Sequence, residues 1–98
     1  MNVVVNLREI ELVENPETLK LFNEDVLTQV EDQRVRRVNL DKAATLAKVS
    51  NSKANIVLKT PAGYKRILTK VSGVDATHVW IENRVIIPLA AIYAVDIA

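Results

Sequence analysis

Residues 54–71 read ANIVLKTPAGYKRILTKV and predict a β-hairpin. Each half of this segment alternates between a face of small or aliphatic side chains and a more polar face, which is the two-residue period of a strand. The halves are joined by Pro61-Ala62-Gly63, where proline fixes φ at the first turn position and glycine tolerates positive φ at the last. We therefore expect strands over residues 54–60 and 64–71, with Lys59 and Tyr64 flanking the turn.

The residues that follow predict three more short strands, over 78–82, 85–87 and 95–97. Ser72-Gly73 interrupts the second strand of the hairpin and indicates a bulge or a sharp bend. Asn83-Arg84 suits a tight turn, and Pro88 ends a strand because it lacks the N–H that a longer strand would use. One helical turn is then expected, with Leu89, Ile92 and Tyr93 at its spacing. The core predicted for these strands consists of Ile56, Leu58, Ile67, Val71, Val79, Ile81, Ile87, Leu89, Ile92, Val95 and Ile97, joined by Phe22 and Val26.

Five short strands with one helical turn before the last follow the order of SH3-like and Sm-like small barrels. The segments Gly73-Val74-Asp75, Val79-Trp80-Ile81-Glu82 and Val85-Ile86-Ile87-Pro88-Leu89 resemble the SH3-like C-terminal domain of the bacterial ribosome-maturation factor, and the resemblance covers residues 64–97. It implies a small barrel and, by analogy of fold, association with the ribosome. The chain as a whole resembles a small bacterial protein, and its N-terminal half has no counterpart in the maturation factor.

The N-terminal half predicts elements that pack on this barrel. Residues 2–12 are typical of a strand with a break near Arg8-Glu9, where the parity of the apolar positions switches. Asn15-Pro16 is a helix-start signal, and apolar residues then recur every three or four positions, which predicts a helix over residues 16–30. In the alternative interpretation the helix ends at Asn23, and residues 26–30 form a strand.

The segment between this helix and the hairpin is expected to be extended over residues 34–40. A short helix, capped by Asp41 or Asn39, is then expected through Ala43, Ala44, Leu46 and Ala47. The polar triplet Ser50-Asn51-Ser52 then indicates a loop. The predicted fold is therefore a single α+β domain over residues 1–98, mainly β. In it, residues 1–52 supply a strand and a helix that pack on a five-stranded SH3-like or Sm-like barrel formed by residues 53–98.

Composition excludes several classes of protein. The 98 residues include no cysteine, which excludes disulfides, thiol catalysis and thiolate metal sites. No segment approaches the roughly 20 apolar residues that a membrane-spanning helix needs. The first residues lack the basic segment and the cleavage site of a secretory signal. We therefore expect a cytoplasmic protein that makes no contact with a membrane.

The net charge of +1 conceals an uneven distribution of charge. Residues 1–32 carry eight acidic and two basic side chains, a net −6, whereas residues 33–74 carry ten basic side chains and one acidic, a net +9. The basic segment is suited to neutralising phosphates, and an aromatic ring beside it is suited to stacking on a base. In the alternative interpretation, the acidic N-terminal segment or a second copy of the chain neutralises the same cations. The candidate nucleic-acid- or partner-binding residues are Arg34, Arg36, Arg37, Lys59, Tyr64, Lys65, Arg66 and Lys70.

Trp80 and His78 share the outward parity of the strand over residues 78–82. An outward tryptophan is either covered by another part of its own chain or left as an interface anchor. The apolar stripe of the helix predicted over residues 16–30 is the expected cover, and an anchor for a partner is the alternative.

No catalytic, cofactor-binding or metal-binding group is predicted. His78 is the sole histidine, and Glu82, four residues further along a strand, lies about 13 Å away by the strand rise. The leading hypothesis is therefore a non-enzymatic cytoplasmic binding or adaptor module, with a protein partner or a second copy of itself as its ligand. The alternative hypothesis is an RNA- or DNA-binding module that uses the basic residues between 34 and 70. Neither hypothesis involves a cofactor or a small-molecule substrate.

Overall fold

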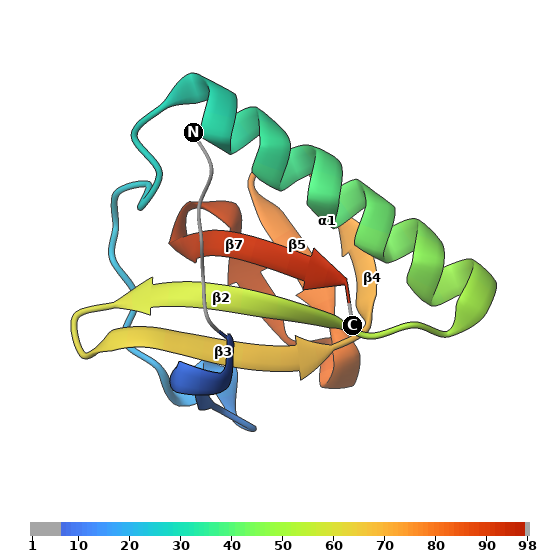
Figure 1. Ribbon diagram of the computed structural model, residues 1–98, viewed down its shortest axis with the longest axis horizontal. Coiled ribbons are helices and arrows are strands. Elements are labelled where there is room, and N and C mark those ends of the chain that lie inside the picture. Colours follow the sequence, from blue (N-terminus) through green and yellow to red (C-terminus); the bar gives the residue numbers. More distant parts are fainter. Residues whose placement is uncertain (1–6, 98) are drawn as a thin grey trace.

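The computed structural model describes residues 7–97, which form an α+β fold of one α-helix and two β-sheets (Figure 1). The helix is α1, Val30–Ser50. The strands are β1 (Glu11–Leu12), β2 (Ala54–Thr60), β3 (Gly63–Thr69), β4 (Val71–Val74), β5 (His78–Ile81), β6 (Ile86–Pro88) and β7 (Ile92–Ile97). Single 3-10 turns lie at Leu7–Glu9, Pro16–Thr18 and Leu89–Ala91, and Glu82–Arg84 forms a non-helical turn.

The predicted hairpin is confirmed. β2 and β3 pair antiparallel, with Ile56 opposite Ile67 and Lys59 opposite Tyr64. Gly63 has a φ of 103°, a conformation that favours glycine because a side chain would be strained there. β1 adds to β3 in parallel and β7 adds to β2 in antiparallel, so the first sheet has the order β1-β3-β2-β7.

The second sheet has the order β4-β5-β6. A single residue, Lys70, separates the end of β3 from the start of β4, so the chain bends from one sheet into the other there. The Lys70 N–H donates to a carboxylate oxygen of Glu82 (2.9 Å) instead of continuing a strand ladder. The predicted interruption near Ser72-Gly73 is present as a shift of register between Val71 and Gly73. The predicted closed barrel is not formed, because the ladders within residues 7–97 divide into these two sheets and none joins β6 to β7.

The C-terminal turns follow the prediction. Asn83 and Arg84 adopt positive φ values of 65° and 62° between β5 and β6. Pro88 is the last residue of β6, and the single helical turn Leu89–Ala91 precedes β7. The turn is shorter than predicted, since β7 begins at Ile92 and therefore includes Ile92 and Tyr93, which were predicted to belong to the turn.

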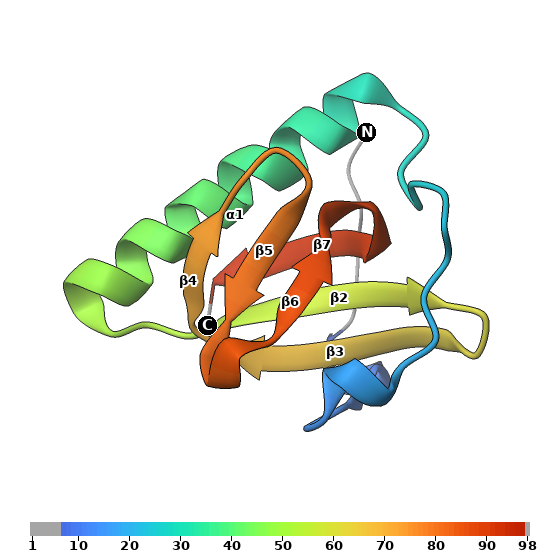
Figure 2. The same ribbon diagram turned by 180° about the vertical axis from the view of Figure 1, so that it is seen from behind.

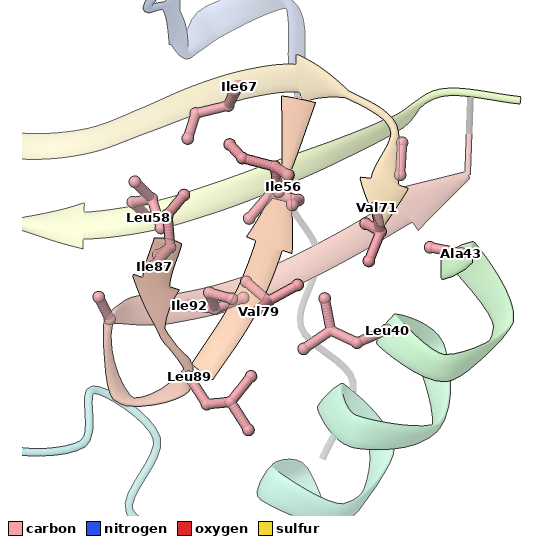
Figure 3. Packing of buried hydrophobic residues seen from close by; sticks show 13 residues of the cluster. Leu40, Ala43, Ile56, Leu58, Ile67, Val71, Val79, Ile87, Leu89 and Ile92 are labelled. Carbon is pink, nitrogen blue, oxygen red and sulfur yellow. The ribbon is translucent and has the colours of Figure 1, made fainter. Parts of the chain in front are cut away.

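The core lies between the two sheets and α1 (Figure 3). Most of the side chains predicted for it are buried there, and Val95 and Ile97 are partly buried against it. Phe22 was a wrong prediction, since its side chain is 41% exposed. Leu40 and Ala43 were not predicted, yet both point from α1 toward the strands, and Leu40 is fully buried.

The helix predicted over residues 16–30 was wrong, and so was the alternative strand over residues 26–30. Asn15-Pro16 does start a helical turn, but that turn ends at Thr18. Further along the chain, backbone N–H groups donate to acceptors outside a helical ladder. The Val26 N–H donates to the carbonyl of Ala90 (2.9 Å). The Leu27 N–H donates to the side chain of Asp25 (2.8 Å). Residues 19–29 therefore run as an irregular segment that leads to α1.

The extended segment predicted over residues 34–40 was also wrong, because α1 is continuous from Val30 to Ser50. The predicted short helix forms part of its C-terminal half. Glu31 and Asp32 occupy the first turn, where the helix dipole favours negative charge. The helix ends at the predicted loop: Asn51 adopts a left-handed conformation (φ 58°), and its N–H donates to the carbonyl of Ala47 (3.0 Å).

α1 lies across one side of the strands and packs on β4 and β7 (Figures 1 and 2). The predicted N-terminal strand over residues 2–12 is only partly testable, since residues 2–6 lie outside the described residues. The predicted break near Arg8-Glu9 falls in the 3-10 turn Leu7–Glu9, and Glu11–Leu12 forms the short strand β1.

Candidate functional site

The three arginines predicted to bind a ligand all lie on α1, and each is paired within the chain. Arg34 donates to both carboxylate oxygens of Glu31 on the same exposed helix surface. Arg37 contacts the carboxylate of Asp41 (3.2 Å) and the carbonyl of Asp75 (2.7 Å). Neither pair is buried, so both contribute little to stability and leave their charges near solvent.

Arg36 lies on the opposite side of α1, and its side chain is only 7% exposed. Its two terminal nitrogens donate to the two carboxylate oxygens of Asp25, each at 2.8 Å, and one of them also donates to the carbonyl of Ile92 (3.0 Å). A paired guanidinium in this position joins the irregular segment, α1 and β7. Arg36 is therefore a structural residue and does not belong to an accessible binding surface.

The electrostatics of Asp25 reflect this pairing. Burial alone would raise the pKa of the Asp25 carboxyl, but hydrogen bonds from Arg36 and from the Leu27 N–H outweigh it, so the pKa lies below its ordinary value. The paired carboxylate is accordingly the form that the folded chain stabilises.

The basic residues of the hairpin are divided between paired and unpaired ones. Lys65 forms an ion pair with Glu11 of β1 (2.7 Å), and Arg66 donates to the side-chain oxygen of Asn55 (3.0 Å). Lys59 and Lys70 make no ion pair within residues 7–97. Acidic residues of the first third therefore match some of the predicted cations, as the alternative interpretation of the charge pattern expects.

Lys59, Tyr64 and Tyr93 form a small cluster on the first sheet. The Lys59 ammonium lies 6.0 Å from the centre of the Tyr64 ring, and the rings of Tyr64 and Tyr93 have centroids 4.8 Å apart, tilted by 56°. The Tyr64 hydroxyl, and then burial, raise the pKa of Tyr93. Tyr64 is 41% exposed, so this cluster offers one accessible ring and one unpaired cation.

Trp80 and His78 lie on the second sheet, and both are half-buried. Trp80 is opposite Gly73 of β4 and Ile86 of β6, and an added Cβ at Gly73 would lie 3.8 Å from the indole ring. The predicted helical cover over residues 16–30 does not form. His78 Nδ1 lies 2.8 Å from the hydroxyl of Thr77, at a turn in which the N–H groups of Thr77 and His78 lower the pKa of Asp75 by donating to its carboxylate.

The surface that sequence analysis missed is an exposed flank of α1, beside the face that packs on the strands. Exposed residues recur there at spacings of four and three, which places them on one face of a helix. We call this face the outer stripe; it consists of Glu31, Val35, Val38, Lys42, Thr45 and Val49. The three valines are 42%, 51% and 76% exposed, in that order. The four-three spacing is a signal only on a helix, and residues 34–40 were predicted to be extended, so it was not recognised.

The surface of the described residues is hollowed at the N-terminal segment and beside α1. A cavity of about 340 Å³ lies between residues 12–17 and the ends of β3 and β5. Its wall contains aliphatic side chains and three glutamates, Glu14, Glu17 and Glu82. A groove of about 460 Å³ between α1 and β4 contains Lys48 and Lys70. Across residues 7–97, no group of three potential metal-binding side chains is present.

Comparison with known proteins adds no assignment: no family model, curated protein or solved structure matches this chain. In the described part of the chain, α1 and the shorter helical turns all lack the length or the apolar character needed to span a membrane.

Proposed function

We propose that this chain is a non-enzymatic cytoplasmic binding module that associates with a second copy of itself through α1. The observation that carries the proposal is the exposure of Val35 and Val38 in the outer stripe, on a helix that already packs on the strands through another face. Scattered single apolar residues are normal on a protein surface, but a regular stripe of them along a helix is typical of an interaction face.

The burial pattern of α1 supports this proposal. On the inward side of its first half, α1 buries Asp32 and Arg36, while Val35 and Val38 are left outside. A helix selected only to cover the strands would place its valines inward and its charged residues outward. The inverted arrangement is accounted for if the outward valines are buried by a partner.

The proposal predicts a mass in solution that rises with concentration. Multi-angle light scattering of the wild-type chain should show an average mass that increases from monomer toward dimer as concentration increases. Val38→Asp should hold the mass at that of the monomer at the same concentrations, because a buried carboxylate in the interface costs more than the contact contributes. A wild-type chain that stays monomeric at every concentration and ionic strength contradicts the proposal.

Ile86→Asp is the matched control for Val38→Asp. Ile86 is 53% exposed and Val38 is 51% exposed, but Ile86 lies on β6 and outside the outer stripe. The control should self-associate as the wild type does. Far-ultraviolet circular dichroism of both variants checks that the fold is retained.

Nucleic-acid binding is the second candidate function, and the cluster of Lys59, Tyr64 and Tyr93 is the observation that favours it. An unpaired cation beside an exposed ring is the combination that single-stranded nucleic acids bind by charge and by stacking. A fluorescent single-stranded RNA oligonucleotide should then bind with an affinity that falls steeply with salt. Tyr64→Leu should weaken binding by about 1–3 kcal/mol if a base stacks on the ring.

The control for this second candidate is Lys48→Glu, which makes the same change of charge as Lys59→Glu but on α1, away from the cluster. Lys59→Glu should weaken RNA binding far more than Lys48→Glu does. Absence of binding by the wild-type chain at low salt, or equal losses in the two variants, removes this candidate.

We also propose that the two sheets are the two halves of an open SH3-like or Sm-like barrel. Two connections support this. Lys70 alone joins β3 to β4, which makes them nearly one bent strand, and after the turn Leu89–Ala91 the chain returns to the first sheet, where β7 pairs with β2.

A further inference from the structure

We infer that α1 pairs antiparallel with α1 of a second copy, with Glu31 opposite the partner's Lys42 and Val35 opposite the partner's Val38. This inference rests on the proposed function and specifies its partner, its orientation and its register. The part of the outer stripe that it uses is the run Glu31, Val35, Val38 and Lys42, all of them exposed.

The spacing of these four residues is four, three and four, which is the spacing of the contact positions of a two-stranded helical pair. The residues of α1 that face the strands are Asp32, Arg36, Leu40 and Ala43. Because the run Glu31, Val35, Val38 and Lys42 is exposed on a flank of α1 beside these buried residues, a second helix can lie along it without displacing the core.

The orientation follows from the order of the charges. Read from either end, the run has a charged residue, two valines and a residue of the opposite charge. In an antiparallel pair, each Glu31 therefore meets a Lys42 and each Val35 meets a Val38. A parallel pair in register would place Glu31 against Glu31 and Lys42 against Lys42, and like charges in contact oppose association.

The flanking positions support the same register. Arg34 and Asp41 lie beside the run on one edge of α1, at positions that face each other in an antiparallel pair, and their charges are opposite. In the single chain, Arg34 pairs with Glu31 and Asp41 pairs with Arg37 in exposed positions. Exposed ion pairs are weak, so these side chains can exchange partners when a second helix binds.

The expected dimer is weak and reversible. The contact run from residue 31 to residue 42 is about 17 Å long at 1.5 Å per residue. A helix pair of this length buries less area than the standard stable interface. In this register Val49 has no partner residue on the second α1. A register that places Val49 against Val38 would bury it, so the exposure of Val49 in the dimer distinguishes the two registers.

Charge reversal tests the pairing. Glu31→Lys alone places lysine opposite lysine, and Lys42→Glu alone places glutamate opposite glutamate, so each variant should be monomeric at concentrations where the wild type dimerises. An equal mixture of the two variants should form a heterodimer, since every contact then joins opposite charges. The double variant Glu31→Lys/Lys42→Glu should dimerise as the wild type does.

Cysteine crosslinking tests the orientation, and the absence of native cysteine makes it unambiguous. Under mild oxidation, a mixture of Glu31→Cys and Lys42→Cys chains should give the mixed disulfide dimer as the main product. Glu31→Cys alone should give little. Preferential crosslinking of Glu31→Cys to itself contradicts the antiparallel pair.

The outcomes separate this inference from the proposed function. A monomeric wild type overturns both. If the wild type dimerises and the variants Glu31→Lys and Lys42→Glu dimerise as well, the register is overturned but the proposed self-association is not. The register is also overturned if Val49→Asp abolishes dimerisation, because Val49 should tolerate the charge. Retention of the dimer by Val49→Asp, together with its loss in the two charge variants, supports the inference.

Discussion

Arg36→Ala is expected to lower the free energy of unfolding by about 3 kcal/mol, because removing one member of a buried ion pair leaves the other uncompensated. The variant loses two hydrogen bonds to Asp25 and one to the carbonyl of Ile92. Asp25 is 29% exposed, so water screens part of the cost, and we place the expected value at the lower end of the usual range. Urea unfolding followed by circular dichroism measures it.

Arg34→Ala is the matched control for Arg36→Ala. It removes an arginine from the same helix, but one whose side chain is 62% exposed and whose ion pair is at the surface. Its urea midpoint should be close to that of the wild type. If the two variants are equally mild, the junction at Arg36 does not hold the irregular segment, α1 and β7 together.

The ion pair between Arg36 and Asp25 makes the free energy of unfolding depend on pH. Because the pKa of Asp25 is lowered on folding, its contribution is fully present above the ordinary value of 3.8 and is lost as the pH falls through the lower pKa of the folded chain. Asp25→Asn lacks this contribution at every pH. The difference in unfolding free energy between wild type and Asp25→Asn should therefore shrink below about pH 4.

Leu40→Ala is expected to lower the free energy of unfolding by about 2–5 kcal/mol, through lost burial and the cavity that remains. Leu40 is fully buried where α1 meets the two sheets, with Val79 and Val71 among the core side chains beside it (Figure 3). The substitution favours the helix itself, because alanine has the highest helix propensity, so any loss reports packing. Denaturant unfolding at constant pH measures the change.

Val49→Ala is the control on the same helix. Its side chain is 76% exposed, so truncation removes little burial in the single chain. We expect a change within about 0.5 kcal/mol, as for most surface substitutions. A loss as large as that of Leu40→Ala would mean that α1 does not pack through the face that contains Leu40.

The strands were predictable because their side-chain alternation is local. Ala54, Ile56 and Leu58 join the main core as their two-residue period indicates, although Asn55 and Val57 on the other face of β2 are buried as well. Gly63 takes the positive φ that its place in the turn requires. What local pattern could not reveal is the division into two sheets. At that division the N–H of Lys70 donates to Glu82, twelve residues away in the sequence, a contact that no local pattern indicates.

The helix was mispredicted because its buried face is charged. A search for apolar residues every three or four positions finds Leu19, Phe22 and Val26, whose segment is held by bonds to Asp25 and Ala90. It passes over α1, where Asp32 and Arg36 occupy inward positions. The burial of Arg36 is compensated by its ion pair with Asp25 and its hydrogen bond to the carbonyl of Ile92, both of them tertiary contacts.

The candidate site was predictable only in part, because the pairing and burial of its residues depend on tertiary contacts. Charge counting correctly indicated that acidic residues of the first third would meet basic ones, as Glu11 meets Lys65. It could not show that Arg36 is buried or that Lys59 lies beside Tyr64 and Tyr93. The outer stripe became visible once α1 was known to be continuous, because its spacing has meaning only on a helix.

The most direct test of the central claim is a dilution series of amide chemical shifts in two-dimensional nuclear magnetic resonance. Self-association through α1 predicts concentration-dependent shifts for residues of the outer stripe, strongest around Val35 and Val38, with the hairpin of β2 and β3 unchanged. Shifts that are confined to the sheets, or spectra that do not change with concentration, would contradict it.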